Sequence, residues 1–168
     1  MSAVANPTIG LRPYLPADAP TLAEIFRASI EELTSDEYSE SQRDAWAEAA
    51  DDMDAFAGKL GRDLTLIATL EGSPVGFASL KDNIKIDLLY VHPAAAGQGA
   101  GAMLCDALEK LAGARGATQL SVDASDNATE FFRKRGYVAQ QRNTVSRGDE
   151  WLANTTMQKA LAAKDKAS

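Results

Sequence analysis

The chain has 168 residues, of which 45% are hydrophobic and 24% charged, and its formal net charge is −7. This size and composition are typical of one globular domain, and the acidic excess argues against nucleic acid as the main partner, because binding phosphates requires clustered Lys and Arg. One cysteine excludes an intrachain disulfide, and one histidine leaves little for a metal site. Without a membrane-length apolar run or signal-peptide features at residues 1–7, we expect a cytoplasmic protein with no membrane partner.

The first third of the chain predicts one strand followed by helices. Thr8–Tyr14 alternates apolar and polar side chains, as a half-buried strand does. Apolar residues then recur at helical spacing up to Leu33, and Asp18 is placed to cap this helix. Residues 39–42, Ser-Glu-Ser-Gln, match a capping box for a second helix. A short third helix is predicted over Met53–Leu60.

Three β segments follow, and short turns join them. The segments are Leu64–Leu70, Pro74–Leu80 and Lys85–Val91. The turn at residues 71–73 contains a glycine, and the turn at 81–84 is polar, so both suit hairpins. The sheet is therefore expected to begin antiparallel.

Residues 96–102 form a glycine-rich stretch, Ala-Gly-Gln-Gly-Ala-Gly-Ala, between a strand and the helical pattern Met103–Leu111. Backbone N–H groups at such a turn bind anions, and the helix dipole adds to the attraction. Glycine permits the positive φ of a tight turn and the close approach of a phosphate. A mobile surface loop is the alternative interpretation. Cys105 falls in the apolar pattern of the helix, so we expect a core residue rather than a nucleophile.

The last third predicts a strand, a helix and a closing hairpin, over Gln119–Val122, Ala128–Arg135, and Tyr137–Ser146 with Glu150–Met157. Asp126 or Asn127 is placed to cap the helix. We expect one α/β domain over residues 1–168 with flexible ends at 1–7 and about 160–168. Its mixed central sheet has about seven strands flanked by about four helices, and one βαβ crossover makes the strands on either side of the glycine-loop helix parallel. The loop then lies at the carboxyl end of a strand, where ligands bind in such sheets.

Two motifs in this order resemble the GNAT superfamily of acyl-CoA-dependent N-acyltransferases, over nearly the whole chain. Residues 89–93, Leu-Tyr-Val-His-Pro, followed by Gly99-x-Gly101, match the family's strand end and pyrophosphate loop, although Ala96 stands where the family usually has Gln or Arg. Residues 127–137, Asn-Ala-x-x-Phe-Phe-x-x-x-Gly-Tyr, match its fourth-helix segment. The resemblance implies acetyl-CoA as the cofactor, bound where the fourth and fifth strands splay apart.

The resemblance also implies which residues contact the cofactor. The main chain of Leu89 and Val91 would pair with the pantetheine arm, and N–H groups of the glycine loop would bind the pyrophosphate. Asn127 would reach the pantetheine or a phosphate, with a plain helix cap as the alternative. The candidate cofactor-binding residues are Leu89, Tyr90, Val91, Gln98, Gly99, Ala100, Gly101, Ala102, Asn127 and Phe132.

Direct attack of an amine on a thioester requires a base, and the leaving thiolate is helped by an acid. Phe132 stands where the family often has the Tyr that protonates the thiolate, so either another hydroxyl such as that of Tyr38 replaces it or the thiolate leaves unassisted. Asp87, which shares strand parity with Leu89 and Val91, is the first candidate for the base, unless it is merely a solvated carboxylate. His92, whose ordinary pKa is near 6.5, and a chain of waters are the alternatives.

The acceptor is expected to enter between the first two helices and the closing hairpin. Gln42 and Trp46 share one helical face there, although Trp46 also suits the core. Asn154 and Thr156 share one face of the last strand and are further candidates for substrate binding. These features predict an N-acetyltransferase that acts on a primary amine of a small molecule or peptide. Phe132 and Ala96 keep a non-catalytic acyl-CoA-binding or sensing module as the alternative, and an exposed hairpin permits a homodimer.

Overall fold

The computed structural model describes residues 8–162, so the expected flexible ends lie outside this range except for residues 160–162. The α-helices are α1 (Ala19–Leu33), α2 (Glu40–Ala47), α3 (Met53–Arg62), α4 (Ala100–Ala114) and α5 (Thr129–Lys134). The strands are β1 (Ile9–Pro13), β2 (Leu64–Leu70), β3 (Ser73–Lys81), β4 (Lys85–Val91), β5 (Gln119–Ser125), β6 (Val138–Arg147) and β7 (Glu150–Ala160). Five helices thus flank the sheet, where we expected about four.

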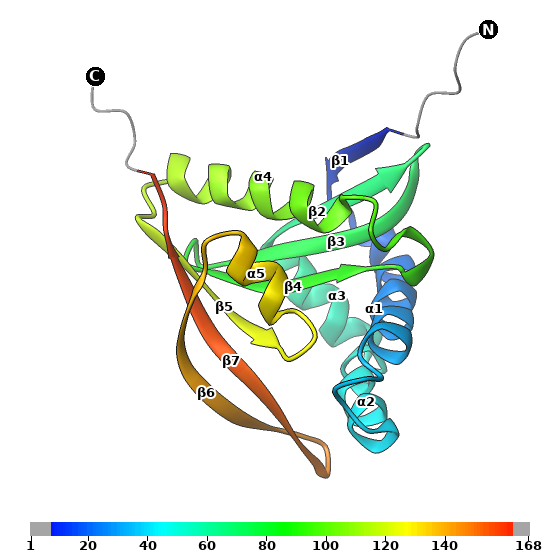
Figure 1. Cartoon of the computed structure of the whole chain (residues 1–168). Coiled ribbons are helices and arrows are strands. Elements are labelled where there is room, and N and C mark those ends of the chain that lie inside the picture. Colours follow the sequence, from blue (N-terminus) through cyan, green and yellow to red (C-terminus); the bar gives the residue numbers. More distant parts are fainter. Residues whose placement is uncertain (1–7, 163–168) are drawn as a thin grey trace, which may run out of the picture.

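The seven strands form one mixed sheet in the order β1-β2-β3-β4-β5-β7-β6 (Figure 1). Every neighbouring pair is antiparallel except β4 and β5, which α4 connects in parallel. This confirms the predicted fold class and its single βαβ crossover. The last strand, β7, lies between β5 and β6, so the closing hairpin joins the sheet through its second strand.

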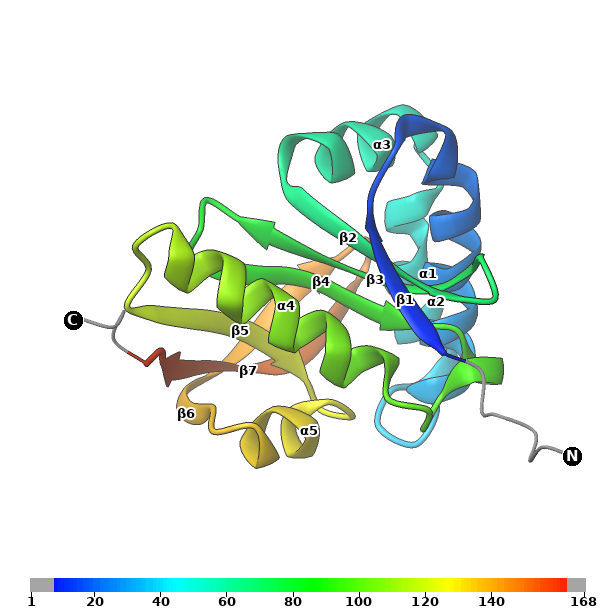
Figure 2. The same cartoon turned by 90° about the horizontal axis from the view of Figure 1, so that it is seen from above.

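Helices cover both faces of the sheet (Figure 2). On one face, α4 places Leu104 and Leu108 against sheet residues that include Leu80 and Ile86. On the other face, α1 and α3 pack around Phe77. Helices α1 and α4 therefore bury most of the apolar stripe that their sequences predict, although Leu33, Met103 and Leu111 remain exposed by 36–37%. Cys105 is fully buried within the first of these two cores, and burial raises the pKa of its thiol to about 12, which confirms that it is a core residue.

The two central strands separate soon after they meet. Strands β4 and β5 pair only at Lys85 with Ser121 and at Ile86 with Val122. Beyond this point residues 88–91 of β4 keep their partner β3, whereas the side toward β5 opens (Figure 1). The predicted splay between strands four and five is therefore present, and it exposes a strand edge inside the molecule.

Some local predictions differ from the structure. The capping box of Ser39 and Gln42 forms with both reciprocal hydrogen bonds. By contrast, Asp18 does not cap α1, because its carboxylate accepts hydrogen bonds from Arg12 and from the backbone N–H of Leu15.

Two predictions near the end of the chain also differ from the structure. Neither Asp126 nor Asn127 caps α5: Asp126 pairs with Arg142, and Asn127 accepts a hydrogen bond from Ser125. The last strand is predicted to end at Met157, yet β7 extends to Ala160, and the N–H of Leu161 donates to the carbonyl of Thr118. In the described part of the chain, no helix is long and apolar enough to cross a membrane.

Candidate active site

Asp87 lies at an irregularity of β4. On β3, Ser79 pairs with Leu88 and Leu80 pairs with Ile86, so Asp87 has no partner between them. This bulge places Asp87 on the α3 side of the sheet, where its carboxylate is 2.8 Å from the Nζ atom of Lys59. The predicted shared parity with Leu89 and Val91 is therefore wrong, because those side chains pack toward α4. An inserted residue reverses the alternation of a strand.

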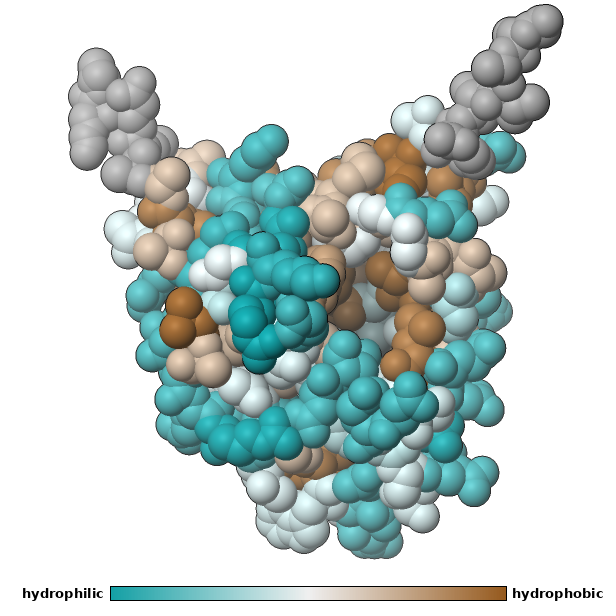
Figure 3. Space-filling model, in the orientation of Figure 1, coloured by the Kyte–Doolittle hydropathy of each residue, from teal (hydrophilic) through white to brown (hydrophobic). Residues whose placement is uncertain are grey.

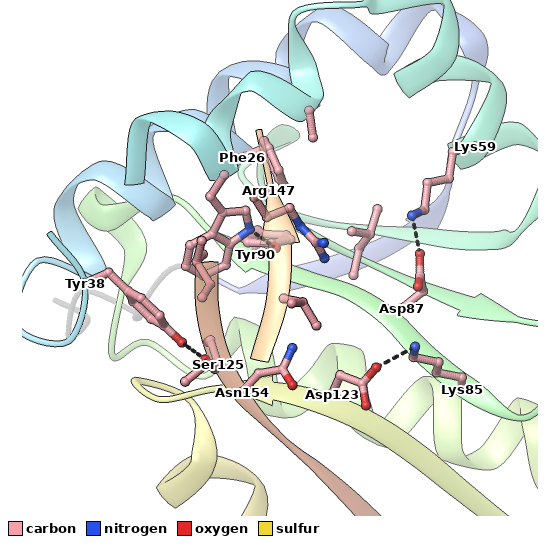
Figure 4. A pocket seen from close by; sticks show the side chains of 16 residues that line it. Phe26, Tyr38, Lys59, Lys85, Asp87, Tyr90, Asp123, Ser125, Arg147 and Asn154 are labelled. Atoms are coloured by element: carbon pink, nitrogen blue, oxygen red, sulfur yellow. Dashed lines mark hydrogen bonds and ion pairs between the residues drawn. The ribbon is translucent and has the colours of Figure 1, made fainter. Parts of the chain in front are cut away.

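A cavity of about 300 Å³ opens beside Asp87, between the N-terminal helices and the closing hairpin. We call it the outer cavity. Phe26, Trp46 and Leu152 supply apolar parts of its wall, and Figure 4 shows Tyr38, Lys59, Asp87, Arg147 and Asn154 around it. It occupies the position at which the acceptor is expected to enter.

A smaller cavity of about 100 Å³ lies in the splay between β4 and β5, and we call it the inner cavity. Leu89, Asn127 and Phe132 line it, each of them a candidate for cofactor binding. Figure 3 shows that this face of the molecule is hollowed between the segment that carries α5 and the helices α1 and α2. The two cavities share six lining residues: Trp46, Asp87, Leu88, Tyr90, Asp123 and Ser125. They therefore meet at a common wall.

Asp123 is the second carboxylate at this common wall, and the sequence analysis missed it. It accepts hydrogen bonds from the Nζ atom of Lys85 at 2.8 Å and from the Oγ1 atom of Thr156 at 2.7 Å. Burial opposes its ionisation, but these two donors hold its pKa below the ordinary value. The available signal was the alternation of polar and apolar residues continuing past Val122, where the predicted strand was ended too early.

Tyr38 connects three separate parts of the chain. Its hydroxyl donates to the carbonyl of Ala153 at 2.6 Å (Figure 4). The same hydroxyl accepts from the N–H of Asp126 at 2.9 Å. Burial raises the pKa of this hydroxyl, although the N–H of Asp126 opposes the shift. The phenol of Tyr38 is thus fixed at the end of β5 and along the wall of the outer cavity.

Trp46 both packs in the core and lines the two cavities. Its ring contacts Tyr38 edge to face with centroids 5.4 Å apart, and its Nε1 atom donates to the hydroxyl of Tyr90 at 3.2 Å. Burial raises the pKa of Tyr90 to about 12, so this hydroxyl stays protonated at neutral pH. The two predicted roles of Trp46, as a core residue and as a side chain at the acceptor site, are therefore compatible.

The structure distributes the other predicted substrate residues unequally. Asn154 lines the outer cavity and accepts a hydrogen bond from Asn143, which also donates to Thr156. Thr156 in turn supports Asp123, as described above. Gln42 is not among the residues that line either cavity; its Nε2 atom donates to the carbonyl of Trp151 at 2.8 Å and ties α2 to the hairpin.

His92 lies at the far end of β4, away from the common wall. Its Nδ1 atom accepts a hydrogen bond from the N–H of Ala94 at 3.0 Å and so caps a short 3₁₀ turn. It is not among the residues that line either cavity. The structure therefore brings Asp87 and Tyr38 to the site and separates His92 from them.

The glycine loop ends in an open helix N-terminus. Gly97 and Gly99 adopt φ of 80° and 94°, which residues with a Cβ rarely adopt. Helix α4 begins at Ala100, no described side chain caps it, and its first intrahelical bond runs from the N–H of Met103 to Gly99. The N–H groups of the first turn thus remain available to a ligand. Within the described residues, no cluster of His, Cys, Asp and Glu is arranged to hold a metal ion.

Comparisons with known proteins agree with this arrangement. Residues 34–161 match the model of the acetyltransferase (GNAT) domain. The chain belongs to the GNAT acetyltransferase family. It is 31% identical over 149 residues to the Escherichia coli K12 N-acetyltransferase YafP, covering 89% of this chain and 94% of that protein.

Two solved structures resemble the chain over most of its length. A crystal structure of a GCN5-related N-acetyltransferase from Rhodopseudomonas palustris is 64% identical with a TM-score of 0.90, covering 96% of this chain and 99% of that one. The PaiA N-acetyltransferase from Thermoplasma acidophilum, solved in complex with coenzyme A, is 20% identical with a TM-score of 0.75. Coverage in that case is 91% of this chain and 99% of the other, and the likeness supports the fold.

Proposed function

We propose that this protein transfers the acetyl group of acetyl-CoA to a primary amine of a small molecule or peptide, by direct attack of the amine. One observation carries the proposal: the outer and inner cavities meet at a wall that holds two carboxylates, Asp87 and Asp123. Such a junction lets an amine from one side reach a thioester on the other. Membership of the GNAT family supports this assignment of the two cavities.

The residues on the cofactor side fit acetyl-CoA. The N–H groups of Ala100, Gly101 and Ala102 at the start of α4 suit the pyrophosphate, because that helix end carries no side-chain cap among the described residues. The edge of β4 that lacks β5 as a partner suits an extended pantetheine arm, which would bind as an added strand. Acetyl-CoA would supply the activated acyl group, and the chain's own residues would align and deprotonate the amine.

Asp87 is our candidate for the general base. A primary amine is protonated at neutral pH, so its proton must leave before it attacks. Asp87 borders both cavities, and its side chain is only 12% exposed. Asp123 is already held by Lys85 and Thr156, which lower its pKa and so weaken it as a proton acceptor. Its carboxylate can instead accept a hydrogen bond from an approaching ammonium group.

Phe132 cannot protonate the leaving thiolate, because a phenyl ring has no acidic proton. Its side chain is buried between Phe131 and Tyr137, so any acid must come from another residue. Tyr38 is our candidate for this role. Its hydroxyl accepts a hydrogen bond from the N–H of Asp126, the residue after Ser125, and Ser125 borders the inner cavity. In the reaction the amine nitrogen would bond to the acyl carbon, the carbon–sulfur bond would break, and the sulfur would receive a proton.

Calorimetric titration with acetyl-CoA tests the proposal first, since a folded protein that does not bind it would contradict the proposal. Release of free CoA thiol is then measured with a panel of amines. Direct attack predicts intersecting double-reciprocal plots, whereas a covalent acetyl-enzyme predicts parallel ones. Binding without turnover would support the alternative of a non-catalytic acyl-CoA-binding module. The cytoplasmic location and the homodimer stay predictions from the sequence.

A further inference from the structure

The outer cavity contains three basic side chains, and two of them are neutralised. Lys59 pairs with Asp87 and Lys85 pairs with Asp123, each at 2.8 Å. The third, Arg147, forms no ion pair with any described residue; its guanidinium donates one hydrogen bond, to the neighbouring carbonyl of Ser146. An acidic protein therefore presents one unneutralised positive charge inside this cavity.

Arg147 is placed by the closing hairpin rather than by the core. It is the last residue of β6, and Figure 4 shows its guanidinium directed into the cavity between Tyr90 and Asp87. Burial raises the pKa of Tyr90 and the charge of Arg147 partly opposes that rise; the same charge adds to the donors that lower the pKa of Asp123, so Arg147 acts electrostatically on the common wall. The arginine thus faces the same space as the two carboxylates but belongs to a different element.

We propose that the acceptor carries a carboxylate as well as its amine, and that the guanidinium of Arg147 binds this carboxylate in the outer cavity. This inference rests on the proposed function and names the substrate class for the same site. A guanidinium presents parallel N–H donors that match the two oxygens of a carboxylate, and such paired hydrogen bonds are strong and directional. Arg147 would therefore select among amines by the anion that they carry.

The remaining wall suits the rest of such a molecule. The carboxylate oxygens of Asp87 and Asp123 offer hydrogen-bond acceptors to an ammonium group at the junction of the cavities, whereas the charge of Arg147, unpaired among the described residues, attracts an anion. Phe26, Trp46 and Leu152 offer an apolar surface for the carbon skeleton. Opposite charges on one small molecule would then orient its amine toward the inner cavity. A polyamine, by contrast, would meet an unpaired positive charge.

The test uses amines in matched pairs that differ only in the carboxylate, such as phenylalanine and 2-phenylethylamine, or 4-aminobutanoate and propylamine. The readout is the ratio of kcat/KM values within each pair, measured by CoA release. Comparing this ratio between variants cancels differences in amine basicity. The variants are Arg147→Gln, Arg147→Lys and the control Arg115→Gln, which removes an exposed arginine just after the end of α4. A phosphonate analogue of phenylalanine distinguishes a carboxylate from a phosphate-type anion.

We expect the wild type to prefer the carboxylate-bearing member by about 10- to 100-fold, mainly through KM, because hydrogen bonds to charged groups contribute on that scale. Arg147→Gln should abolish most of this preference, Arg147→Lys should keep part of it, and Arg115→Gln should keep all of it. If the protein prefers the phosphonate analogue over phenylalanine, the anion that Arg147 binds is of the phosphate type and not a carboxylate. That result would overturn the inference.

Further outcomes would contradict either the carboxylate inference or the proposed function, and the measurements distinguish the two cases. If the protein binds acetyl-CoA and acetylates the neutral amines equally well, or if Arg147→Gln leaves the ratio unchanged, the carboxylate inference fails and the proposed function stands. If it binds acetyl-CoA and acetylates neither class, the inference fails and the non-catalytic alternative is supported. If acetyl-CoA does not bind, the proposed function itself fails.

Discussion

The ammonium of Lys59 on α3 lies 2.8 Å from the carboxylate of Asp87 at the bulge of β4, so an ion pair joins a helix to the irregular point of the central strand. The lysine side chain is 43% exposed and that of the aspartate 12%, which leaves the pair open on the lysine side. Asp87 is thus fixed in place and still borders both cavities.

Asp87→Asn removes the proposed base and keeps the shape of the side chain. We expect kcat for amine acetylation to fall about 100- to 10,000-fold, as general-base catalysis contributes on that scale. The dissociation constant for acetyl-CoA, measured by calorimetry, should change less than about twofold. Asp54→Asn, an exposed aspartate on α3, is the matched control and should retain full activity. An Asp87→Asn protein with most of its activity would instead assign the base to another group.

Tyr38→Phe removes a hydroxyl that holds both Asp126 and Ala153. We expect the free energy of unfolding to fall by about 1–3 kcal/mol, because the two backbone groups lose a buried partner. Thermal denaturation measures the effect, at about 3 °C for each kcal/mol in a chain of this size. Tyr14→Phe is the control: the hydroxyl of Tyr14 is buried without a hydrogen-bond partner among the described residues, so its removal should be neutral or slightly stabilising.

The same Tyr38→Phe variant tests the role of Tyr38 as the acid. A thiol has an ordinary pKa near 8.5, so above that pH the released sulfur is mostly thiolate and protonation by an acid contributes less. We expect the loss in kcat to be larger at pH 7 than at pH 9. A loss that is equal at both pH values would indicate that Tyr38 only positions the strands.

Gly99→Ala should weaken acetyl-CoA binding. Alanine at φ of +94° is strained by about 1 kcal/mol, and relief of this strain would turn the N–H groups at the start of α4 away from a bound pyrophosphate. We expect the dissociation constant to rise about tenfold. Gly113→Ala lies inside the same helix, where nothing within 4 Å obstructs a methyl group, and should instead stabilise the fold by about 0.5–1 kcal/mol. Equal affinities for all three proteins would contradict the phosphate-binding role of the loop.

Asp18→Asn should change the pH dependence of stability. Two hydrogen bonds from Arg12 hold the pKa of Asp18 below its ordinary value of 3.8 in the folded state. The stabilisation is therefore complete above that ordinary value and is lost as the pH falls through the lower folded value. In urea denaturation, the variant should be less stable by about 1 kcal/mol at pH 7 and should approach the wild type as the pH falls progressively below 3.8. Asp36→Asn, an exposed aspartate, should show no such convergence.

Local sequence signals predicted much of the fold, and contacts distant in the sequence explain most of the errors. The predicted bounds of β2 and β4 agree with the structure, because turn residues and apolar runs define both strands locally. The strand after α4 was ended at Val122, yet β5 continues to Ser125 because β7 pairs with it over its full length. The prediction that Asp18 caps α1 is wrong for a similar reason, because its carboxylate binds Arg12, which lies on β1.

The candidate site was predictable only where a backbone motif marks it. The glycine loop and the residues of β4 stand in continuous motifs, so the cofactor side could be described before the structure. The orientation of Asp87 depends on a bulge that has no sequence signature here, and strand parity gave the wrong face. From the sequence, Arg147 could be assigned only to the closing hairpin. Its position in the outer cavity could not be predicted, because it depends on how β6 and β7 attach to the sheet.

The insertion of β7 between β5 and β6 also determines when the protein can fold during synthesis. Until β7 leaves the ribosome, β6 has no partner in the sheet and the outer edge of β5 stays unpaired. Ala153, which receives the hydroxyl of Tyr38, belongs to the same late segment. The nascent chain must therefore hold an open sheet edge until residue 160 has been translated, and such an edge can pair with another chain in the meantime.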